Sequence, residues 1–232
     1  MKKLFLFVLP LVAMLYAGCS ESGQAVSGAI TGANNLQVTL DQVYFDRNTS
    51  VSLGKAACDG EGKFDLKLEK PLEEGLYRLT IGAKRVFFIL NGEEKTVNIT
   101  GDLGTIDRME LGVTGSETFK CYTDIIQDLI KNQAKTPEDA KNAVKKGCTP
   151  LMRAFLATQL FGQNAPAFMD DLQAYRKELN DDMPGSKYAT GYETIITQLE
   201  KQLTAQTGAG ASPADDGPIQ IGSVAPEISL PD

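Results

Sequence analysis

Four cysteines carry most of the chemistry that this sequence could perform, because the chain contains no histidine. They are Cys19, Cys58, Cys121 and Cys148, in a chain of 232 residues. Without histidine there is no Ser-His-Asp triad, no Cys-His dyad and no imidazole ligand for a metal ion. No two cysteines have the C-x-x-C spacing of a redox motif. The residues therefore indicate no active site, and neither a cofactor nor a metal ion is expected.

Charge excludes a further class of function. The net charge is −7, whereas binding to nucleic acid requires a clustered basic face. The basic pair Lys145-Lys146 is expected at a helix C-terminus, where the helix dipole favours cations. Adjacent residues on a helix do not share a face, so paired acids are interpreted as solvated surface groups rather than metal or acid-base pairs. These pairs are Asp170-Asp171, Asp181-Asp182 and Asp215-Asp216.

The N-terminus has the pattern of a processed secretion signal. Lys2 and Lys3 precede an apolar run from Leu4 to Leu15, which is shorter than the roughly 18 residues that span a membrane. The small pair Ala17-Gly18 directly before Cys19 resembles a bacterial lipobox. That resemblance implies cleavage before Cys19 and lipid attached to its sulfur and amine. The alternative is an ordinary secretory signal with Cys19 as a plain thiol.

A lipidated Cys19 would make the membrane the first partner of this protein and leave the folded body in water. The expected location is the cell envelope, with the body facing the periplasm. Ser20 favours retention at the outer membrane over the inner one, and the choice between the two membranes stays open.

The other three cysteines allow two interpretations. The compartment outside the cytoplasmic membrane tolerates disulfides, and a bridge between Cys121 and Cys148 is geometrically feasible because both fall in the helical part. The favoured interpretation is that Cys58, Cys121 and Cys148 pack as three small buried hydrophobic residues. Sequence alone does not fix disulfide connectivity.

The first half of the chain alternates as β-strands do. Between residues 24 and 115, apolar residues recur at every second position and turn residues interrupt them at short intervals. Leu40 and Val43 lie on opposite parities, which indicates a turn or bulge near Asp41-Gln42. Val86 to Leu90 is a continuous apolar run, typical of a strand buried on both faces. The predicted turns are Asp59-Gly60, Glu74-Gly75, Asn91-Gly92 and Gly101-Asp102.

Roughly eight short strands of this kind predict a small antiparallel β-sandwich or barrel. The aromatic residues Tyr77, Phe87 and Phe88 are interpreted as part of its core. A groove that binds a peptide is the alternative for this aromatic cluster.

The second half changes to a helical period. Phe119 and Tyr122 begin an apolar stripe, and Thr136-Pro137 and Thr149-Pro150 each combine an N-cap with proline at the first helical position. Asn164 with Pro166 is expected to cap the next helix, and Ser186 to open the last one. Five helices after eight strands give the α+β class with a segregated helical region.

The expected domain organisation follows from these patterns. Residues 24–115 form the sandwich and residues 116–206 the helical domain. Residues 1–18 are the signal peptide and 19–23 a lipidated tether. Residues 207–218, rich in Gly, Ala, Ser, Pro and Asp, form a flexible linker, and 219–232 begin a further domain that this chain does not contain.

Two parts of the chain resemble known families. The segment from Ile221 to Asp232, IGSVAPEISLPD, resembles the opening of thioredoxin-like domains of the AhpC/TSA and TlpA/ResA-like families. Residues 24–115 resemble the β-sandwich domain of unknown function that precedes such domains in Gram-negative envelope lipoproteins. The motifs that carry this resemblance are FDL at 64–66, EGLYRL at 74–79, FFILNG at 87–92 and VNITGD at 97–102.

The resemblance implies the non-catalytic N-terminal region of a membrane-anchored thiol-disulfide oxidoreductase. The catalytic cysteines of that family have no counterpart here, so this chain as given is not expected to be an enzyme, although the full-length relative would be one. The region could position or dimerise the redox domain. The alternative is a stand-alone envelope lipoprotein that binds a protein or peptide through its sandwich or helices.

Overall fold

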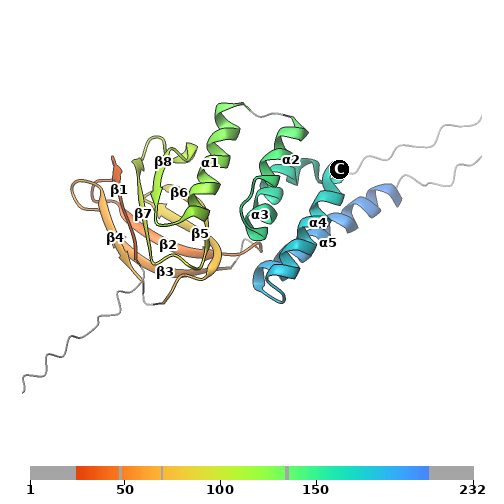
Figure 1. Cartoon of the computed structure of the whole chain (residues 1–232), viewed down its shortest axis with the longest axis horizontal. Coiled ribbons are helices and arrows are strands. Elements are labelled where there is room, and N and C mark those ends of the chain that lie inside the picture. The colour runs from red at the N-terminus through yellow and green to blue at the C-terminus, as the bar shows by residue number, and fades with distance from the viewer. Residues whose placement is uncertain (1–24, 47–48, 69, 134–135, 209–232) are drawn as a thin grey trace, which may run out of the picture.

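The computed structural model describes residues 25–46, 49–68, 70–133 and 136–208 (Figure 1). In this part of the chain eight strands precede five α-helices, which confirms the α+β class. The strands are β1 (Ala25–Thr31), β2 (Gln37–Val43), β3 (Ser50–Ala57), β4 (Lys63–Lys67), β5 (Glu74–Ile81), β6 (Lys84–Asn91), β7 (Thr96–Asp102) and β8 (Leu111–Thr114). The helices are α1 (Glu117–Lys131), α2 (Pro137–Lys145), α3 (Pro150–Phe161), α4 (Met169–Asp182) and α5 (Lys187–Gly208).

The strands form two four-stranded sheets, ordered β4-β1-β7-β8 and β3-β2-β5-β6. Neighbouring strands are antiparallel as predicted, except that β1 and β7 run parallel, with Val26 opposite Val97. A parallel pair needs a long crossover, and here the chain forms β2 and β3 of the second sheet, β4 of the first, and β5 and β6 of the second before β7. The register of β2 against β3 shifts between Leu40 and Asp41, which is the predicted bulge.

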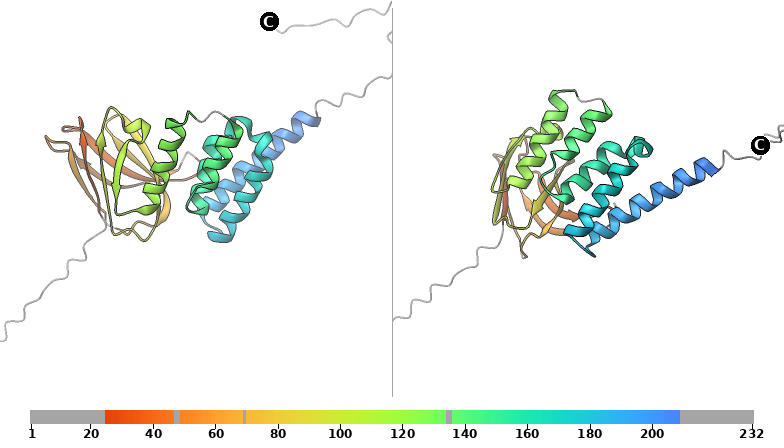
Figure 2. Two further views of the ribbon diagram at one scale, coloured as in Figure 1. Left: turned by 45° about the horizontal axis from the view of Figure 1, so that its top comes forward. Right: turned by 45° about the vertical axis from the view of Figure 1, so that its right-hand side comes forward.

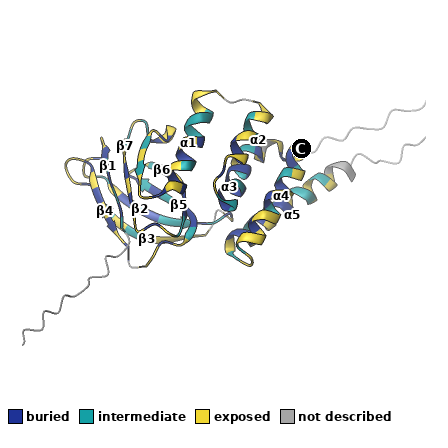
Figure 3. Cartoon of the chain, viewed as in Figure 1, coloured by how far each residue is buried: buried dark blue, intermediate teal, exposed yellow. Residues whose placement is uncertain are grey.

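The alternation of apolar residues explains why the sheets face each other. The strands place apolar side chains on the faces that meet, and these faces bury one another at about 1.5–3 kcal/mol per large side chain. Strands β5 and β6 also carry buried apolar residues, Leu76 and Ile89, on their outer face, which the helices cover. Buried residues gather inside the sandwich and along the helix faces that meet (Figure 3). The fully buried side chains include Val26, Ile30, Val97 and Ile99 from one sheet and Leu40, Leu79, Ile81 and Phe88 from the other.

Two of the four predicted turns are wrong. Asp59-Gly60 and Asn91-Gly92 do lie at chain reversals, whereas Glu74-Gly75 begins β5 and Gly101-Asp102 ends β7. At these two strand positions glycine is needed because another side chain packs directly against its Cα atom, and not because the chain turns. A Cβ on Gly75 would lie 2.5 Å from the hydroxyl oxygen of Tyr188, and a Cβ on Gly101 would lie 2.8 Å from the Cδ2 atom of Leu111.

Helix α1 belongs with the sandwich, because it contacts the edge strands β6 and β8. The Phe119 ring stacks on Phe88 with 4.4 Å between ring centroids, and Phe88 stacks on Tyr77 at 5.6 Å. Ser116 caps the helix, since its Oγ accepts the N–H of Phe119 at 3.1 Å. The same hydroxyl donates to the buried carboxylate of Glu94 at 2.6 Å, which holds the start of α1 on the sandwich.

Helices α2 to α5 pack in sequence, each against the next (Figure 2). Thr136, Thr149 and Ser186 accept the predicted N-cap hydrogen bonds. The prediction of an N-cap at Asn164 is wrong, because residues Gly162–Phe168 form a 3-10 helix whose backbone bends at Asn164. The stacked rings of Phe161 and Phe168, 4.2 Å apart, hold this segment together. Among the helices that the structure describes, none has the length and apolar character needed to cross a membrane.

Helix α5 docks on the sandwich through Tyr188. The Tyr188 hydroxyl accepts hydrogen bonds from the Leu76 N–H at 3.1 Å and from Nε2 of Gln42 at 3.2 Å. Burial raises the pKa of Tyr188 to about 12, so the phenol stays neutral at physiological pH. One turn along α5, the Tyr192 ring lies 5.3 Å from that of Phe45, two residues after β2. These contacts fix the helices relative to the sandwich.

The docking predicts a specific effect of substitution at residue 75. Gly75→Ala is expected to lower the free energy of unfolding by about 2 kcal/mol, because its Cβ would clash with the Tyr188 hydroxyl. Tyr188→Phe alone should cost about 1 kcal/mol through the lost hydrogen bonds. Urea unfolding is expected to show that the double variant loses clearly less than the sum of the two. Gly60→Ala is the control, because no atom lies within 4 Å of its Cβ position, and additive losses would contradict the docking argument.

Candidate functional site

A groove of about 330 Å³ lies where the sandwich meets helices α3 and α5, and we name it the junction groove. One wall is formed by the end of β2, the start of β3 and the outer face of β5 and β6. The other wall is formed by α3 with one residue of α5. The lining residues that matter here are Tyr44, Arg78, Phe87, Phe155, Thr158 and Gln159.

Phe87 is the exposed aromatic residue of the groove. Its side chain is 38% exposed, whereas its strand neighbours Val86 and Phe88 are buried. The alternation along β6 places Phe87 on the outer face, where its ring centroid lies 6.4 Å from that of Phe155 on α3. The interpretation of the aromatic cluster as core is confirmed for Tyr77 and Phe88 and is wrong for Phe87.

Arg78 and Asp41 form an ion pair on the sandwich wall of the groove. The register of β2 and β5 places the two residues opposite each other. Asp41 Oδ2 accepts from Nη2 of Arg78 at 2.7 Å and from Nε at 3.3 Å. The side chains are 27% and 15% exposed, so each charge depends on the other for compensation. Because Asp41 engages only part of the guanidinium, further donors of Arg78 remain for a ligand.

These groups suit binding rather than catalysis. Aromatic rings, a guanidinium and the amide of Gln159 can pack against a polypeptide segment and hydrogen-bond to its backbone. No histidine or cysteine lines the groove, so its hydroxyl groups have no imidazole or thiolate partner. In the part of the chain that the structure describes, no three His, Cys, Asp or Glu side chains gather in a way that could hold a metal ion.

Cys121 and Cys148 form a disulfide, with 6.6 Å between their Cα atoms. The expectation of three packed thiols is therefore wrong for this pair, and the alternative bridge is the one present. The expectation of a packed thiol is confirmed for Cys58, which is free and buried. Burial, with a smaller effect from the neighbouring Asp59, raises the pKa of the Cys58 thiol. Cys58 is therefore protonated at neutral pH and is a poor nucleophile.

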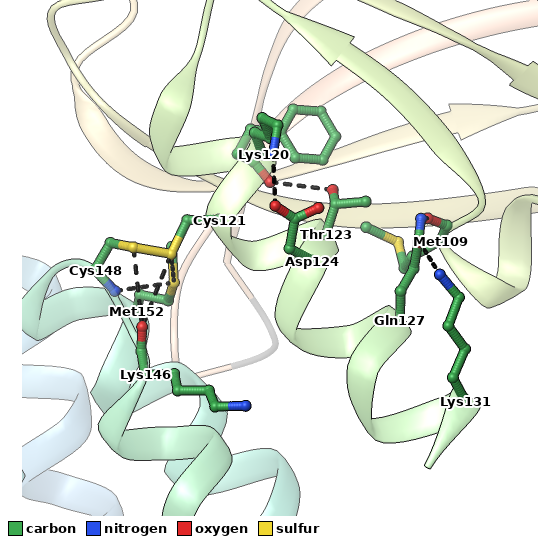
Figure 4. A network of polar contacts seen from close by, with 11 residues as sticks. Met109, Lys120, Cys121, Thr123, Asp124, Gln127, Lys131, Lys146, Cys148 and Met152 are labelled. Atoms are coloured by element: carbon green, nitrogen blue, oxygen red, sulfur yellow. Dashed lines mark hydrogen bonds and ion pairs between the residues drawn. A yellow bond between two sulfur atoms is a disulfide. The ribbon is translucent and has the colours of Figure 1, made fainter. Parts of the chain in front are cut away.

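The disulfide joins helix α1, which packs on the sandwich, to the helical group of α2 and α3 (Figure 4). Cys121 lies in α1, and Cys148 lies in the short turn between α2 and α3. Other contacts hold this turn. The Cys148 N–H lies 3.4 Å from Sδ of Met152, and Nη1 of Arg153 donates to the carbonyl of Gly147 at 2.8 Å. The bridge thus fastens the start of α3 to a helix that belongs to the sandwich.

The remaining predicted residues lie at the surface. Asp171 pairs with Lys141 at 2.7 Å and Asp181 with Lys177 at 2.5 Å, which agrees with solvated acids rather than a metal site. Lys145 ends α2 and Lys146 is its C-cap, as expected from the helix dipole. Cys19, Asp215-Asp216 and residues 219–232 lie outside the described residues.

Sequence reasoning missed most of the groove. Tyr44, Phe155 and Gln159 come from separate elements that meet only in the folded chain. Arg78 and Asp41 are charged residues within predicted strands. A charge in a strand only weakly indicates an oppositely charged partner on a neighbouring strand. The antiparallel register of β2 against β5, which runs without a shift, places the two residues opposite each other. Without that register, neither residue could have been assigned to a site.

Comparison with known proteins adds no family. No family model matches the chain, and no curated protein matches it. The 5-hydroxyisourate hydrolase of Klebsiella pneumoniae is 13% identical, and the match covers 40% of this chain and 99% of that chain with a TM-score of 0.27. A 9R-lipoxygenase from Cyanothece is 11% identical, and the match covers 78% of this chain and 33% of that chain with a TM-score of 0.24. Likeness at this level carries no argument about fold or activity.

The disulfide is expected to stabilise the fold. Because it closes a loop with a sequence separation of 27, replacing both cysteines by serine should lower the free energy of unfolding by about 3 kcal/mol. Chemical denaturation of the oxidised protein and of the double variant measures this difference. Asp128→Ala, which removes the exposed ion pair with Lys146 beside the bridge, is the control and should cost less than about 1 kcal/mol. Equal losses of unfolding free energy in the two variants would show that the bridge stabilises the fold no more than an exposed ion pair does.

Proposed function

We propose that this chain is the non-catalytic N-terminal region of a lipid-anchored envelope thiol-disulfide oxidoreductase. In this proposal, lipid on Cys19 holds the protein at the membrane, and residues 25–208 position a thioredoxin-like domain that begins near residue 219. The body itself performs no redox catalysis of the C-x-x-C type. A homodimer through this region is one way in which the body could position two redox domains.

The path of the chain through the body is the observation that carries the proposal. The start of β1 lies on the sandwich, and α5 runs away from the sandwich to the opposite end of the molecule (Figures 1 and 2). With 22 residues, α5 is about 33 Å long. A body built in this way keeps the entry of the chain at β1 apart from its exit at the end of α5. That is the geometry needed between a membrane anchor and a domain that must meet its substrates in water.

Two further observations support this function. A disulfide within the body suits an oxidising compartment outside the cytoplasm. The order of the sequence motifs, from the lipobox at Cys19 through the sandwich to the segment at 221–232, is that of the thioredoxin-like envelope lipoproteins.

The anchor and the missing domain can be tested together in the native host. Cys19→Ala is expected to abolish incorporation of labelled palmitate and to release the protein from the membrane fraction, because the thiol is the site of acylation. Cys58→Ala is the matched control and should leave the protein in the membrane fraction. The mass of the native protein should exceed that of residues 19–232 plus lipid by a whole domain that contains W-C-x-x-C. A native protein that ends at Asp232 would refute the oxidoreductase proposal.

A stand-alone binding module is the second candidate, and the junction groove favours it. The groove exposes an aromatic ring at Phe87 beside the guanidinium of Arg78, which is the combination that recurs in interfaces. A protein or peptide segment would be its ligand, bound without any chemical change.

Phe87→Ser tests this second candidate. The substitution should weaken binding of peptides selected from a random library by at least about tenfold, because the central aromatic contact is lost. Val51→Ser is the matched control, since Val51 is 42% exposed but does not line the groove. Isothermal titration with one selected peptide measures both variants. If Val51→Ser weakens binding as much as Phe87→Ser does, the groove is not the binding site.

A further inference from the structure

The Cys121–Cys148 disulfide lies at the surface of the molecule, unlike the buried thiol of Cys58. Cys148 is an exposed residue and Cys121 is half-buried. Exposed disulfides are the ones that exchange readily with thiols, whereas enclosed ones resist reduction. The more exposed residue of the bridge, Cys148, is the one that a thiol in solution reaches more easily.

We propose that Cys121–Cys148 is a thiol-disulfide exchange site that accepts two electrons from a protein dithiol. A thiolate of the partner attacks Sγ of Cys148, the bond between Cys148 and Cys121 breaks, and Cys121 leaves as a thiolate. The second thiolate of the partner then attacks its own sulfur in the mixed disulfide, which forms the partner's disulfide and releases Cys148 as a thiolate. The two protons of the partner's thiols pass through solvent to Cys121 and Cys148. One dithiol is oxidised for each bridge reduced.

The position of Cys148 suits the second step. Cys148 directly precedes Thr149, the N-cap of the twelve-residue helix α3. The positive end of the helix dipole stabilises a thiolate at this place and makes Cys148 a good leaving group. The contact of its N–H with Sδ of Met152 holds the residue on its turn while the bond to Cys121 breaks.

The surroundings also accommodate the reduced state. The carbonyl oxygen of Lys146 lies 3.9 Å from Sγ of Cys121 and 3.9 Å from Sγ of Cys148. A disulfide sulfur carries no hydrogen, so in the oxidised protein these are contacts without a hydrogen bond. After reduction each sulfur becomes an S–H group and can donate to that carbonyl. Both redox states therefore find a partner at the same place.

Reduction would loosen one side of the helical group. An open pocket of about 220 Å³ separates parts of α1 and α2 next to the bridge. The ion pair of Lys146 with Asp128 also spans them, but its side chains are 58% and 47% exposed and such pairs contribute little. The bridge is the covalent tie between α1 and the start of α3, whereas further along α3 the Phe155 ring lies 6.0 Å from that of Tyr122 on α1. Because α3 carries Phe155 and Gln159, the redox state would set the mobility of one wall of the junction groove.

This inference goes beyond the proposed function and does not depend on it, because the dithiol can belong to a separate protein. It concerns cysteines outside any C-x-x-C motif. A chain that ends at Asp232 and lacks a redox domain could still have this site.

Reduction kinetics of the folded full chain test the proposal, with dithiothreitol as the dithiol. Reduction without denaturant, followed by alkylation and peptide mapping, should proceed at a rate proportional to the dithiothreitol concentration. The rate should lie within about tenfold of that of the denatured chain. Cys58 is the internal control and should be alkylated only after denaturation. A rate that becomes independent of dithiothreitol and equals the rate of global unfolding would overturn the proposal.

Two single variants test the second step, the release of Cys148 as a thiolate, through its reverse reaction. With glutathione disulfide as the probe, Cys148 in Cys121→Ser should form a mixed disulfide about tenfold faster than Cys121 in Cys148→Ser, because it is exposed and lies at a helix N-terminus. Circular dichroism checks that both variants fold. Equal rates, or a faster reaction at Cys121, would overturn the assignment of Cys148 as the sulfur that carries the mixed disulfide.

Hydrogen exchange of the wild-type protein needs no variant and tests the structural consequence. Amides of α2 and of the start of α3 should exchange about tenfold faster after reduction, because the local opening that exposes them becomes easier. Amides of β5 serve as the control and should not change. Unchanged exchange in α2 and α3 would overturn the link between the bridge and the groove wall.

Discussion

The contact of Tyr188 with the start of β5 determines how the two halves of this molecule meet. A buried, neutral phenol accepts the N–H of Leu76, and it occupies the space that any side chain at residue 75 would need. Since α5 is fixed by this contact, α4 and then α3 take their places by packing in turn. The width of the junction groove therefore depends on a hydrogen bond at Leu76, which lines it, and on the missing methyl group at the neighbouring Gly75.

The helical group is held to the sandwich on two sides by different forces. On the α5 side the attachment is non-covalent and aromatic, through Tyr188, Tyr192 and Phe45. On the α1 side the attachment includes a covalent bond, which lies beside an open pocket between α1 and α2. The first side responds to mutation and temperature, whereas the second also responds to redox conditions. The protein can therefore stay folded while the α3 wall of the junction groove changes its mobility.

Local signals in the sequence were sufficient for much of the fold. Caps such as Thr136-Pro137 act within one helical turn, and the parity change around Asp41 acts within one strand, so both could be predicted. At Gly75 the sequence predicts a turn, although the residue lies in a strand. The collision that requires glycine there comes from Tyr188 of the last helix, and local sequence does not reveal it. The exposure of Phe87 and the partner of Arg78 likewise depend on elements distant in sequence. The disulfide was foreseen only as an alternative, because pairing requires a distance that spacing does not provide.

The parallel pairing of β1 with β7 has a consequence for the order of assembly. The two strands are separated by roughly 70 residues, and contacts of this sequence separation slow folding because loop closure must come first. During synthesis β1 is complete long before β7 exists, and β4 can cover only one of its two edges. Until residue 102 has emerged, the other edge presents unpaired backbone donors and acceptors, the condition under which strands join the wrong chain. The sheet is thus joined at its centre only when β7 pairs with β1, and β8 then adds the last edge strand.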